Sequence, residues 1–363
     1  MIRRRLCASL VALFLAAAPA QAGAEEPLHF STPITYGTHL PGLGKPVKDW
    51  AAEVGALSGG TLSFDIEQPG QNVMPQDILD AVSKGTAAAG FSKAEFWANR
   101  LPAAALFSGF PFGPDAKTYA AWFYAGNGLT LYQHMYDDGG FNVHVLPCAF
   151  GGAETAGWFA KELKSPEDIE RLRIRIFGQG GLVMQKLGAS PALVPGSKLN
   201  QAFQDGDIDA AELYPPPVDA RTDLAGAVKR IYLPGWQQPE TVMELLINKD
   251  RWNALDDQQQ LWIETACRDT MFQTMSENPV LAAKALSDFA DQGVTIETLP
   301  APVLDRLHQT WDEIAAQQGK HDPFFSQVLD DIRKFRAEIA TPGAVAPMAG
   351  ASSLEPPMTS ATE

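Results

Sequence analysis

The sequence contains little cysteine, little histidine and almost no long apolar run. It has 3 cysteines and 6 histidines among 363 residues, and the histidines show no metal-ligand spacing. Neither a Gly-x-Ser-x-Gly elbow nor a His-Glu-x-x-His helix occurs. Beyond the first residues, no segment holds about 18 uninterrupted apolar residues. These absences count against the familiar hydrolases and against a membrane-spanning segment, so we expect a soluble mature protein that is not an enzyme.

Positive charge is also scarce. The chain has 28 lysines and arginines against 43 aspartates and glutamates, which gives a net charge of -15. Such an acidic surface disfavours binding to nucleic acid and to anionic lipid. It says little about the sign of a small ligand, because a local site can carry the opposite charge.

The first 22 residues have the features of a cleaved export signal. Residues 3–5 are arginines, and 6–18 form an apolar run that is too short to span a bilayer comfortably. Residues 20–22 read Ala-Gln-Ala, a small-x-small cleavage site. We therefore predict that the mature chain begins near residue 23 and lies in the periplasm, with three arginines fewer and a net charge of about -18.

Cleavage leaves two cysteines, Cys148 and Cys267. The oxidising periplasm permits a disulfide between them. The sequence cannot show that two residues so far apart are close in space. From the sequence we therefore expect two separate buried thiols.

A strand–helix unit occurs twice in the chain. Apolar residues that alternate indicate strands, and apolar residues three or four apart indicate helices. The first copy has strands near 28–30, 62–66 and 86–91 and helices at 45–58 and from Pro75; the second has strands at 172–176, 191–194 and 208–213 and helices at 182–187 and 199–204. This alternation favours mainly parallel sheets with helices on both faces. We predict two α/β lobes that face each other across a ligand cleft at the carboxyl ends of their strands.

The rest of the chain is mostly helical. Helical spacing covers 256–276, 279–292, 302–319 and 323–340, with a short strand at 294–298. We expect a signal peptide at 1–22, mainly the first lobe at 23–150, mainly the second lobe at 151–250, a helical segment at 251–340 that braces the lobes or pairs subunits, and a disordered tail at 341–363. The tail is rich in proline, alanine and serine and has little charge, a composition typical of disorder.

Five segments together resemble one known family. They are Asp80-Ala81-Val82-Ser83-Lys84-Gly85, Gly157-Trp158-Phe159, Leu172-Arg173-Ile174-Arg175, Gly206-Asp207-Ile208-Asp209-Ala210-Ala211-Glu212 and Leu233-Pro234-Gly235-Trp236. In this order and spacing they are similar to the solute-binding proteins of TRAP (tripartite ATP-independent periplasmic) transporters, over roughly residues 28–340. The last two segments most resemble the branch that binds 2-oxo acids and other small carboxylates together with a metal cation.

The resemblance implies a fold, partners and a ligand. The fold would be a two-lobed α/β periplasmic solute-binding protein whose lobes are joined by β-strand hinges and a long helix and close on the ligand. The partners would be the small and large membrane subunits of the transporter. Some members of the branch pair through their C-terminal helices, which makes a homodimer one expectation. A binding protein that reports its ligand to a sensor kinase would show the same sequence features.

Arg173 is the residue that the resemblance assigns to the ligand carboxylate. A guanidinium is a planar, permanently charged fork that matches two carboxylate oxygens. Arg171, Arg173 and Arg175 alternate along one predicted strand and would point to the same side, so the pattern alone does not choose among them. The family register favours Arg173. Glu212 ends a buried strand, where a carboxylate needs a nearby cation, and the resemblance places it beside the ligand and the metal.

Four positions depart from the branch. Leu213 stands where tryptophan is usual, Gln238 where glutamate is expected, Glu154 where glutamine is usual, and Phe96 where tyrosine is usual. One acid is thus exchanged for another, and the formal charge of the site is kept. Two interpretations remain open. A sodium or calcium ion could be held at Glu154, Glu212, Leu213 and Gln238, since oxygen ligands suit hard cations, or the ligand itself could carry an ammonium group.

Aromatic and amide side chains complete the predicted site. Tyr214 and Trp236 are candidates for its walls, as is Trp158, for which core packing is the more common role. Gln179 lies in the glycine-rich turn 178–181 and is a candidate donor to the ligand. This turn lacks the spacing of a dinucleotide-binding fingerprint.

Overall fold

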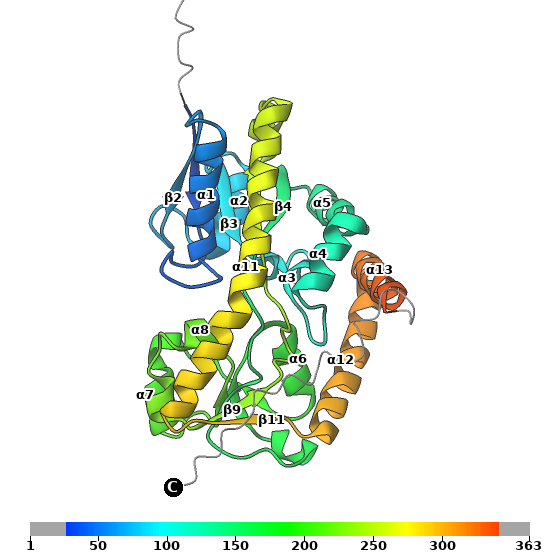
Figure 1. Ribbon diagram of the computed structural model, residues 1–363. Helices are drawn as coiled ribbons and strands as arrows, with labels where there is room; N and C mark the ends of the chain where they lie inside the picture. Colours follow the sequence, from blue (N-terminus) through cyan, green and yellow to red (C-terminus); the bar gives the residue numbers. More distant parts are fainter. Residues whose placement is uncertain (1–26, 341–363) are drawn as a thin grey trace, which may run out of the picture.

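The structure is a computed structural model, and it describes residues 27–340. The predicted signal peptide and the predicted disordered tail lie outside these residues. Within them the chain folds into two α/β lobes, one above the other in Figure 1, with one long helix running along both. No helix in the described part combines the length and the hydropathy needed to cross a bilayer.

The first lobe places its strands in the order β2-β1-β3-β10-β4. β1 (Leu28–Pro33) pairs in parallel with β2 (Leu62–Glu67), and a parallel bridge from Ile34 to Phe91 links β1 to β3 (Ala89–Ser92). β10 (Val242–Asn248) is antiparallel to β3 and to β4 (Val143–Phe150). The helices of this lobe are α1 (Lys45–Leu57), α2 (Ile78–Ser83), α3 (Ala104–Ser108), α4 (Ala116–Ala125) and α5 (Gly128–Asp138).

The second lobe is built on a six-stranded sheet in the order β11-β9-β5-β8-β6-β7. β6 (Arg173–Arg175) is parallel to β7 (Ser190–Pro191) and to β8 (Ala210–Ala211). β5 (Gly157–Phe159) is antiparallel to β8 and to β9 (Arg230–Leu233), and β11 (Thr295–Thr298) is parallel to β9. Its helices are α6 (Gly178–Lys186), α7 (Leu199–Gln204), α8 (Pro216–Asp219) and α9 (Leu224–Ala227).

The two lobes repeat one plan, which confirms the predicted α/β fold. Three consecutive strands lie in parallel in the order second, first, third, as β2-β1-β3 and as β7-β6-β8. The local pattern explains the elements. In α1, Val47, Trp50 and Val54 are buried at three- and four-residue spacing. Gly59 and Gly60, both with positive φ, follow the end of the helix.

Between residues 143 and 291 the chain crosses between the lobes three times. Residues 151–156 lead from β4 to β5, residues 234–241 lead from β9 to β10, and the third crossing is α11 (Asp257–Asp291). β10 therefore lies in the first lobe, although the expected division counted 242–248 with the second. All of its residues are buried, because it is the middle strand between β3 and β4.

α11 is a single helix of 35 residues, where the sequence predicted two helices that meet at Pro279. A proline removes one backbone donor from a helix, but here the helix continues through it. Packing at both ends holds it in place, since α11 contacts α1 and β4 in the first lobe and α8 and β11 in the second. The helix begins with a capping box between Asp256 and Gln259.

Cys148 and Cys267 form a disulfide, which corrects the expectation of two separate thiols. The bond joins β4 to α11, with an S–S distance of 2.02 Å, inside the core of the first lobe. The two residues are 119 positions apart, and only the packing of α11 on β4 brings them together. The first lobe is thus covalently attached to the connecting helix.

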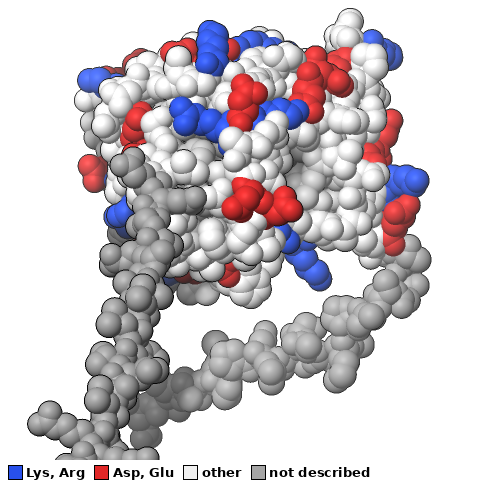
Figure 2. Space-filling model, turned by 90° about the horizontal axis from the view of Figure 1, so that it is seen from above, with Lys and Arg blue, Asp and Glu red and all other residues white. Residues whose placement is uncertain are grey.

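The last two helices also touch both lobes. α12 (Ala301–His321) contacts α6 of the second lobe, and α13 (Pro323–Ile339) contacts α3, α4 and α5 of the first (Figure 1). On the face seen in Figure 2, acidic and basic side chains are interspersed rather than gathered by sign. The charge that a small ligand meets is therefore set by the local site.

Candidate functional site

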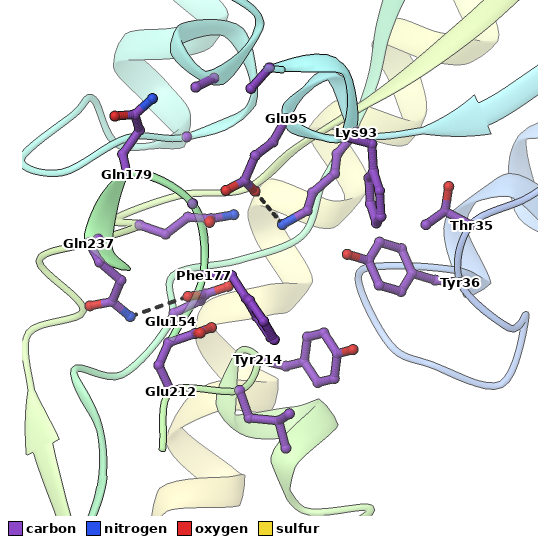
Figure 3. A pocket seen from close by; sticks show the side chains of 18 of the residues that line it. Thr35, Tyr36, Lys93, Glu95, Glu154, Phe177, Gln179, Glu212, Tyr214 and Gln237 are labelled. Atoms are coloured by element: carbon purple, nitrogen blue, oxygen red, sulfur yellow. Dashed lines mark hydrogen bonds and ion pairs between the residues drawn. The ribbon is translucent and has the colours of Figure 1, made fainter. Parts of the chain in front are cut away.

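A cleft of about 560 Å³ lies between the lobes. Its walls come from the loops after β1, β3, β6 and β8 and from the two crossing segments 151–156 and 234–241 (Figure 3). The charged, amide and aromatic residues of the lining are Tyr36, Lys93, Glu95, Phe96, Asn99, Glu154, Arg175, Phe177, Gln179, Glu212, Tyr214, Gln237 and Gln238. The cleft at the carboxyl ends of the repeated strands is where the sequence predicts a ligand site.

Arg175 is the arginine of this cleft. It is the last residue of β6, and its side chain is 8% exposed. Nη1 donates to Glu212 Oε2 at 3.1 Å and to the main-chain carbonyl of Glu212, while the guanidinium lies 4.2 Å from the centre of the Phe177 ring. Nε is buried and makes no hydrogen bond within the described residues. One part of the fork is therefore held by Glu212, while Nε has no partner among the described residues.

Arg173, predicted as the carboxylate clamp, lies outside the cleft. Its Nε and Nη2 donate to both carboxylate oxygens of Asp209, at 2.9 and 3.0 Å, and its side chain is 46% exposed. These hydrogen bonds, with one from the Arg173 main-chain N–H, lower the pKa of Asp209. The guanidinium of Arg173 is thus satisfied within its own lobe. The arginine nearer the carboxyl end of β6, Arg175, is the one that lines the cleft.

Glu154 and Glu212 both line the cleft, and they lie close enough for each to affect the pKa of the other. Gln237 Nε2 donates to Glu154 Oε2 at 3.2 Å (Figure 3). Burial, and then the charge of Glu212, raise the pKa of Glu154 well above its ordinary value, although Lys93 opposes this. Burial also raises the pKa of Glu212, against the charge of Arg175. The pair therefore favours a positive partner, either a proton or a cation.

The crossing segments hold Glu154 in position. Its main-chain N–H donates to the Gln238 carbonyl at 3.2 Å, and the Gly151 N–H donates to the Thr241 carbonyl at 2.7 Å, so the two segments run as a hydrogen-bonded pair. Gly235 packs directly on Glu154, because a Cβ there would lie 2.1 Å from the Glu154 carbonyl oxygen. This close approach gives a physical reason for glycine in the Leu-Pro-Gly-Trp segment.

Five further residues singled out in the sequence line the cleft: Phe96, Gln179, Leu213, Tyr214 and Gln238. Gln179 accepts a hydrogen bond from Gln318 of α12 at 2.9 Å, and Gln238 Nε2 donates to Thr241 Oγ1 at 2.7 Å. Their positions agree with the expected site, and their contact with a ligand stays a prediction.

Two tryptophans lie elsewhere. Trp236, predicted as a wall, is buried beside Phe112 with ring centres 5.9 Å apart, and it lines other cavities than this cleft. Its neighbour Gln237 is the residue that reaches the cleft, where it donates to Glu154. Trp158 is fully buried, and its indole N–H donates to Asp219 at 2.8 Å, which is the core role considered more common for it.

Sequence reasoning missed several lining residues, among them Tyr36, Lys93, Glu95 and Phe177. Each lies in a loop or a short helical turn after a strand, where no periodic pattern marks a buried side chain. The Tyr36 ring makes edge contacts with Phe96 at 6.3 Å and with Tyr214 at 6.0 Å, which connects the aromatic walls of the two lobes. The one available signal was their place directly after predicted strands, where ligand loops begin.

Residues that line the cleft carry oxygen atoms that could hold a cation. They are the carboxylates of Glu154 and Glu212, the amide oxygen of Gln238, and the carbonyl of Leu213, which accepts no hydrogen bond from any residue of 27–340. Within the same range, no three Asp, Glu, His or Cys side chains gather as a metal-binding group. Two carboxylates with neutral oxygens suit sodium or calcium better than a transition metal.

Comparison with known proteins places the chain in a family. Residues 40–321 match the family described as bacterial extracellular solute-binding protein, family 7. A monocarboxylate 2-oxoacid-binding periplasmic protein of Nostoc sp. is 31% identical over 289 residues, which cover 80% of this chain and 79% of the relative.

Solved structures of TRAP solute-binding proteins share the fold. One from Colwellia psychrerythraea, with bound calcium and pyruvate, has a TM-score of 0.81 and 27% identity and covers 86% of this chain and 95% of its own. One from Pseudoalteromonas atlantica, with bound sodium and pyruvate, has a TM-score of 0.79, 27% identity and the same coverage. One from Bordetella bronchiseptica, with calcium and picolinate, has a TM-score of 0.80 and 25% identity and covers 87% and 93%. This chain therefore belongs to family 7 of the bacterial extracellular solute-binding proteins, the solute-binding proteins of TRAP transporters.

Proposed function

We propose that this chain captures a small carboxylate of the 2-oxo or hydroxy acid class in the periplasm and passes it to the membrane subunits of a TRAP transporter. The observation that carries the proposal is Arg175, a buried guanidinium with unused donors inside the cleft between the lobes. The relatives named above bind pyruvate and picolinate, which are both small carboxylates. This chain is proposed to do the same with Arg175 in place of the Arg173 expected from the sequence.

The bonding of Arg175 suits a carboxylate ligand. Nη1 is occupied by Glu212, so the edge formed by Nε and Nη2 remains. That edge carries two parallel N–H donors, which match the two oxygens of one carboxylate. A buried donor without a partner is costly, and a bound carboxylate would remove this cost. Phe177 below the guanidinium keeps the fork from turning.

A sodium or calcium ion is proposed to bind with the ligand. It would be held by Glu154 and Glu212, with the Leu213 carbonyl and the Gln238 amide oxygen completing its shell. Support comes from the two neighbouring carboxyl groups, because burial raises the pKa of both and thereby favours a positive partner. A bound ion would supply a positive charge beside the ligand carboxylate, and Glu154 and Glu212 would orient it.

A ligand that carries its own ammonium group is the second candidate. Four aromatic rings line the cleft together with the acids, and three of them, Tyr36, Phe96 and Tyr214, are in edge contact. Aromatic faces near carboxylates are suited to quaternary and primary ammonium groups. Such a zwitterion would place its carboxylate on Arg175 and its ammonium near Glu154 and Glu212, and it would need no metal ion.

Export and assembly belong to the same proposal. The N-terminal sequence features support a signal peptide. The disulfide between Cys148 and Cys267 also supports export, because disulfides form and persist in oxidising compartments such as the periplasm. The small and large membrane subunits would be the partners that receive the ligand. One relative crystallised as a dimer, and a homodimer is proposed for this chain through its C-terminal helices.

Calorimetry on the metal-stripped mature protein tests the function. A thermal-shift panel of pyruvate, lactate, picolinate and zwitterionic carboxylates is run first, because a ligand that binds only the folded state raises the melting temperature. We expect a 2-oxo acid to bind in calcium or sodium and to bind at least about tenfold more weakly after chelation. A panel in which no small carboxylate raises the melting temperature would refute the proposed function. Undiminished binding after chelation would refute the ion alone.

A further inference from the structure

Lys93 is a largely buried cation in the cleft, and it has no part in the proposed binding of the first carboxylate or of the ion. It lies between β3 and the short helix η2 (Ala94–Trp97), and its side chain is 15% exposed. Its Nζ lies 2.7 Å from Glu95 Oε2, and both residues line the cleft (Figure 3). A lysine is seldom buried, because removing an ammonium from water is costly. Its position in a ligand cleft therefore calls for an explanation.

The surroundings keep Lys93 charged and hold it in one place. Burial acts to lower its pKa, but the negative charge of Glu95, followed by Tyr36 and Glu154, raises the pKa well above its ordinary value. Glu95 in turn is packed against the second lobe, because a Cβ at Gly178 would lie 2.0 Å from Glu95 Oε1. Glu95 is thus a positioning residue that fixes the ammonium where the lobes approach each other.

Lys93 stands on the opposite lobe from Arg175. Arg175 comes from β6 of the second lobe and Lys93 from the loop after β3 of the first, and the two line one cavity. An ammonium has three donors, and Lys93 has one ion-pair partner, Glu95, among residues 27–340. Its remaining donors can bind acceptors in the cavity. A ligand between the lobes would therefore meet a cation from each.

We propose that Lys93 is a specificity-determining residue, which selects carboxylates that carry a further oxygen acceptor, either a 2-oxo group or a second carboxylate, over simple carboxylic acids. This inference rests on the proposed function, because Arg175 holds the first carboxylate. Binding of that first carboxylate is assigned to Arg175 and the proposed ion and does not need Lys93, whereas the preference among carboxylates requires Lys93. An experiment can therefore refute the role of Lys93 in selectivity and leave the proposed binding of carboxylates intact.

Titration calorimetry with three acids tests the inference. Propionate has no further acceptor, pyruvate has a 2-oxo group, and 2-oxoglutarate adds a distal carboxylate. The mature protein is measured in a buffer of fixed calcium concentration, beside Lys93→Met. We expect the unmodified protein to prefer at least one substituted acid over propionate by about tenfold or more, as for a hydrogen bond to a charged donor. In Lys93→Met that preference should fall to about onefold, with propionate affinity little changed.

Two further variants keep the result interpretable. The double variant Lys93→Met/Glu95→Gln removes both charges and leaves no lone buried carboxylate, so it should fold even if the single variant does not. Lys161→Met is the matched control, because Lys161 is 77% exposed and pairs with Asp209 outside the cleft. Retention of the full preference in both Lys93 variants would overturn the inference and leave the proposed function standing. Failure of the unmodified protein to bind any of the three acids would count against both.

Discussion

The two lobes share one strand order and differ in how they hold the connecting helix. In the first lobe, β4 is joined to α11 by the disulfide between Cys148 and Cys267. In the second, α11 is held by packing, with Phe289 edge-on to Trp158 at 4.9 Å between ring centres. A disulfide stays intact when the lobes shift slightly, whereas packing contacts can be replaced by other contacts at a small cost in free energy. We infer that the first lobe and α11 form a fixed base on which the second lobe is held.

Removal of the disulfide should have the largest effect. Crosslinking a loop of 119 residues lowers the entropy of the unfolded chain, which corresponds to about 5 kcal/mol in the chain-entropy treatment. We expect the Cys148→Ala/Cys267→Ala double variant to lose stability of this order in urea unfolding. A loss below about 1 kcal/mol would show that the covalent attachment is not what distinguishes the first lobe.

Removal of the packing contact in the second lobe should cost somewhat less. Phe289 is 2% exposed and belongs to the core around Trp158. Truncation of a buried phenylalanine costs about 3–5 kcal/mol, from lost apolar contact and from the cavity left behind, so Phe289→Ala should show a loss in this range by urea unfolding. Phe272→Ala on the same helix is the matched control, since Phe272 is 62% exposed, and it should change stability by less than about 0.5 kcal/mol. Equal effects of the two substitutions would contradict the account.

A smaller effect should appear on acidification, and it should arise in the first lobe. His144 of β4 is stacked on Trp252 at 4.0 Å, and its Nε2 is buried without a hydrogen bond within the described residues. Burial, then the charge of Lys249, lowers its pKa from 6.5 to about 4. The folded protein therefore resists protonation of His144, so the associated stability is present above pH 6.5 and is lost as the pH falls toward 4.

A pKa lowered from 6.5 to about 4 corresponds to a loss of about 3 kcal/mol of folding stability once the pH has fallen to 4. His144→Phe keeps a ring for the stack and removes the titrating group, so its melting temperature should fall less between pH 7 and pH 4.5 than that of the unmodified chain. Residues 151–241 of the second lobe contain no histidine, so no equivalent effect is expected there. Parallel melting curves for the two proteins across this range would exclude His144 as the source.

Much of the fold could be predicted from local pattern. The apolar spacing of α1 and the glycines after it, and the alternation in β2, are visible in the sequence because they bury one face of each element. The repeat was visible because each copy buries the same faces of its strands and helices, which gives both copies the same apolar pattern. The continuous helix through Pro279 was missed, since it depends on packing of α11 against both lobes.

The site could be predicted by region but only partly by residue. Glu212 was found because an acid at the end of a buried strand needs a partner, and Glu154 because it departs from the family pattern. Arg173 was chosen over Arg175 from the family register, since a two-residue alternation puts both on one side and cannot say which one Asp209 will bind. Lys93 was missed because its burial depends on the approach of the second lobe. Such contacts are set by the fold as a whole.

The most direct test compares the two arginines of β6. Arg175→Lys and Arg173→Lys each keep a positive charge but lose the planar fork, and pyruvate binding to each is measured by titration calorimetry with calcium present. We expect Arg175→Lys to weaken binding by at least about tenfold and Arg173→Lys to leave it within about twofold, because only Arg175 faces the cleft. Strong loss of binding in Arg173→Lys, with full binding in Arg175→Lys, would contradict the account.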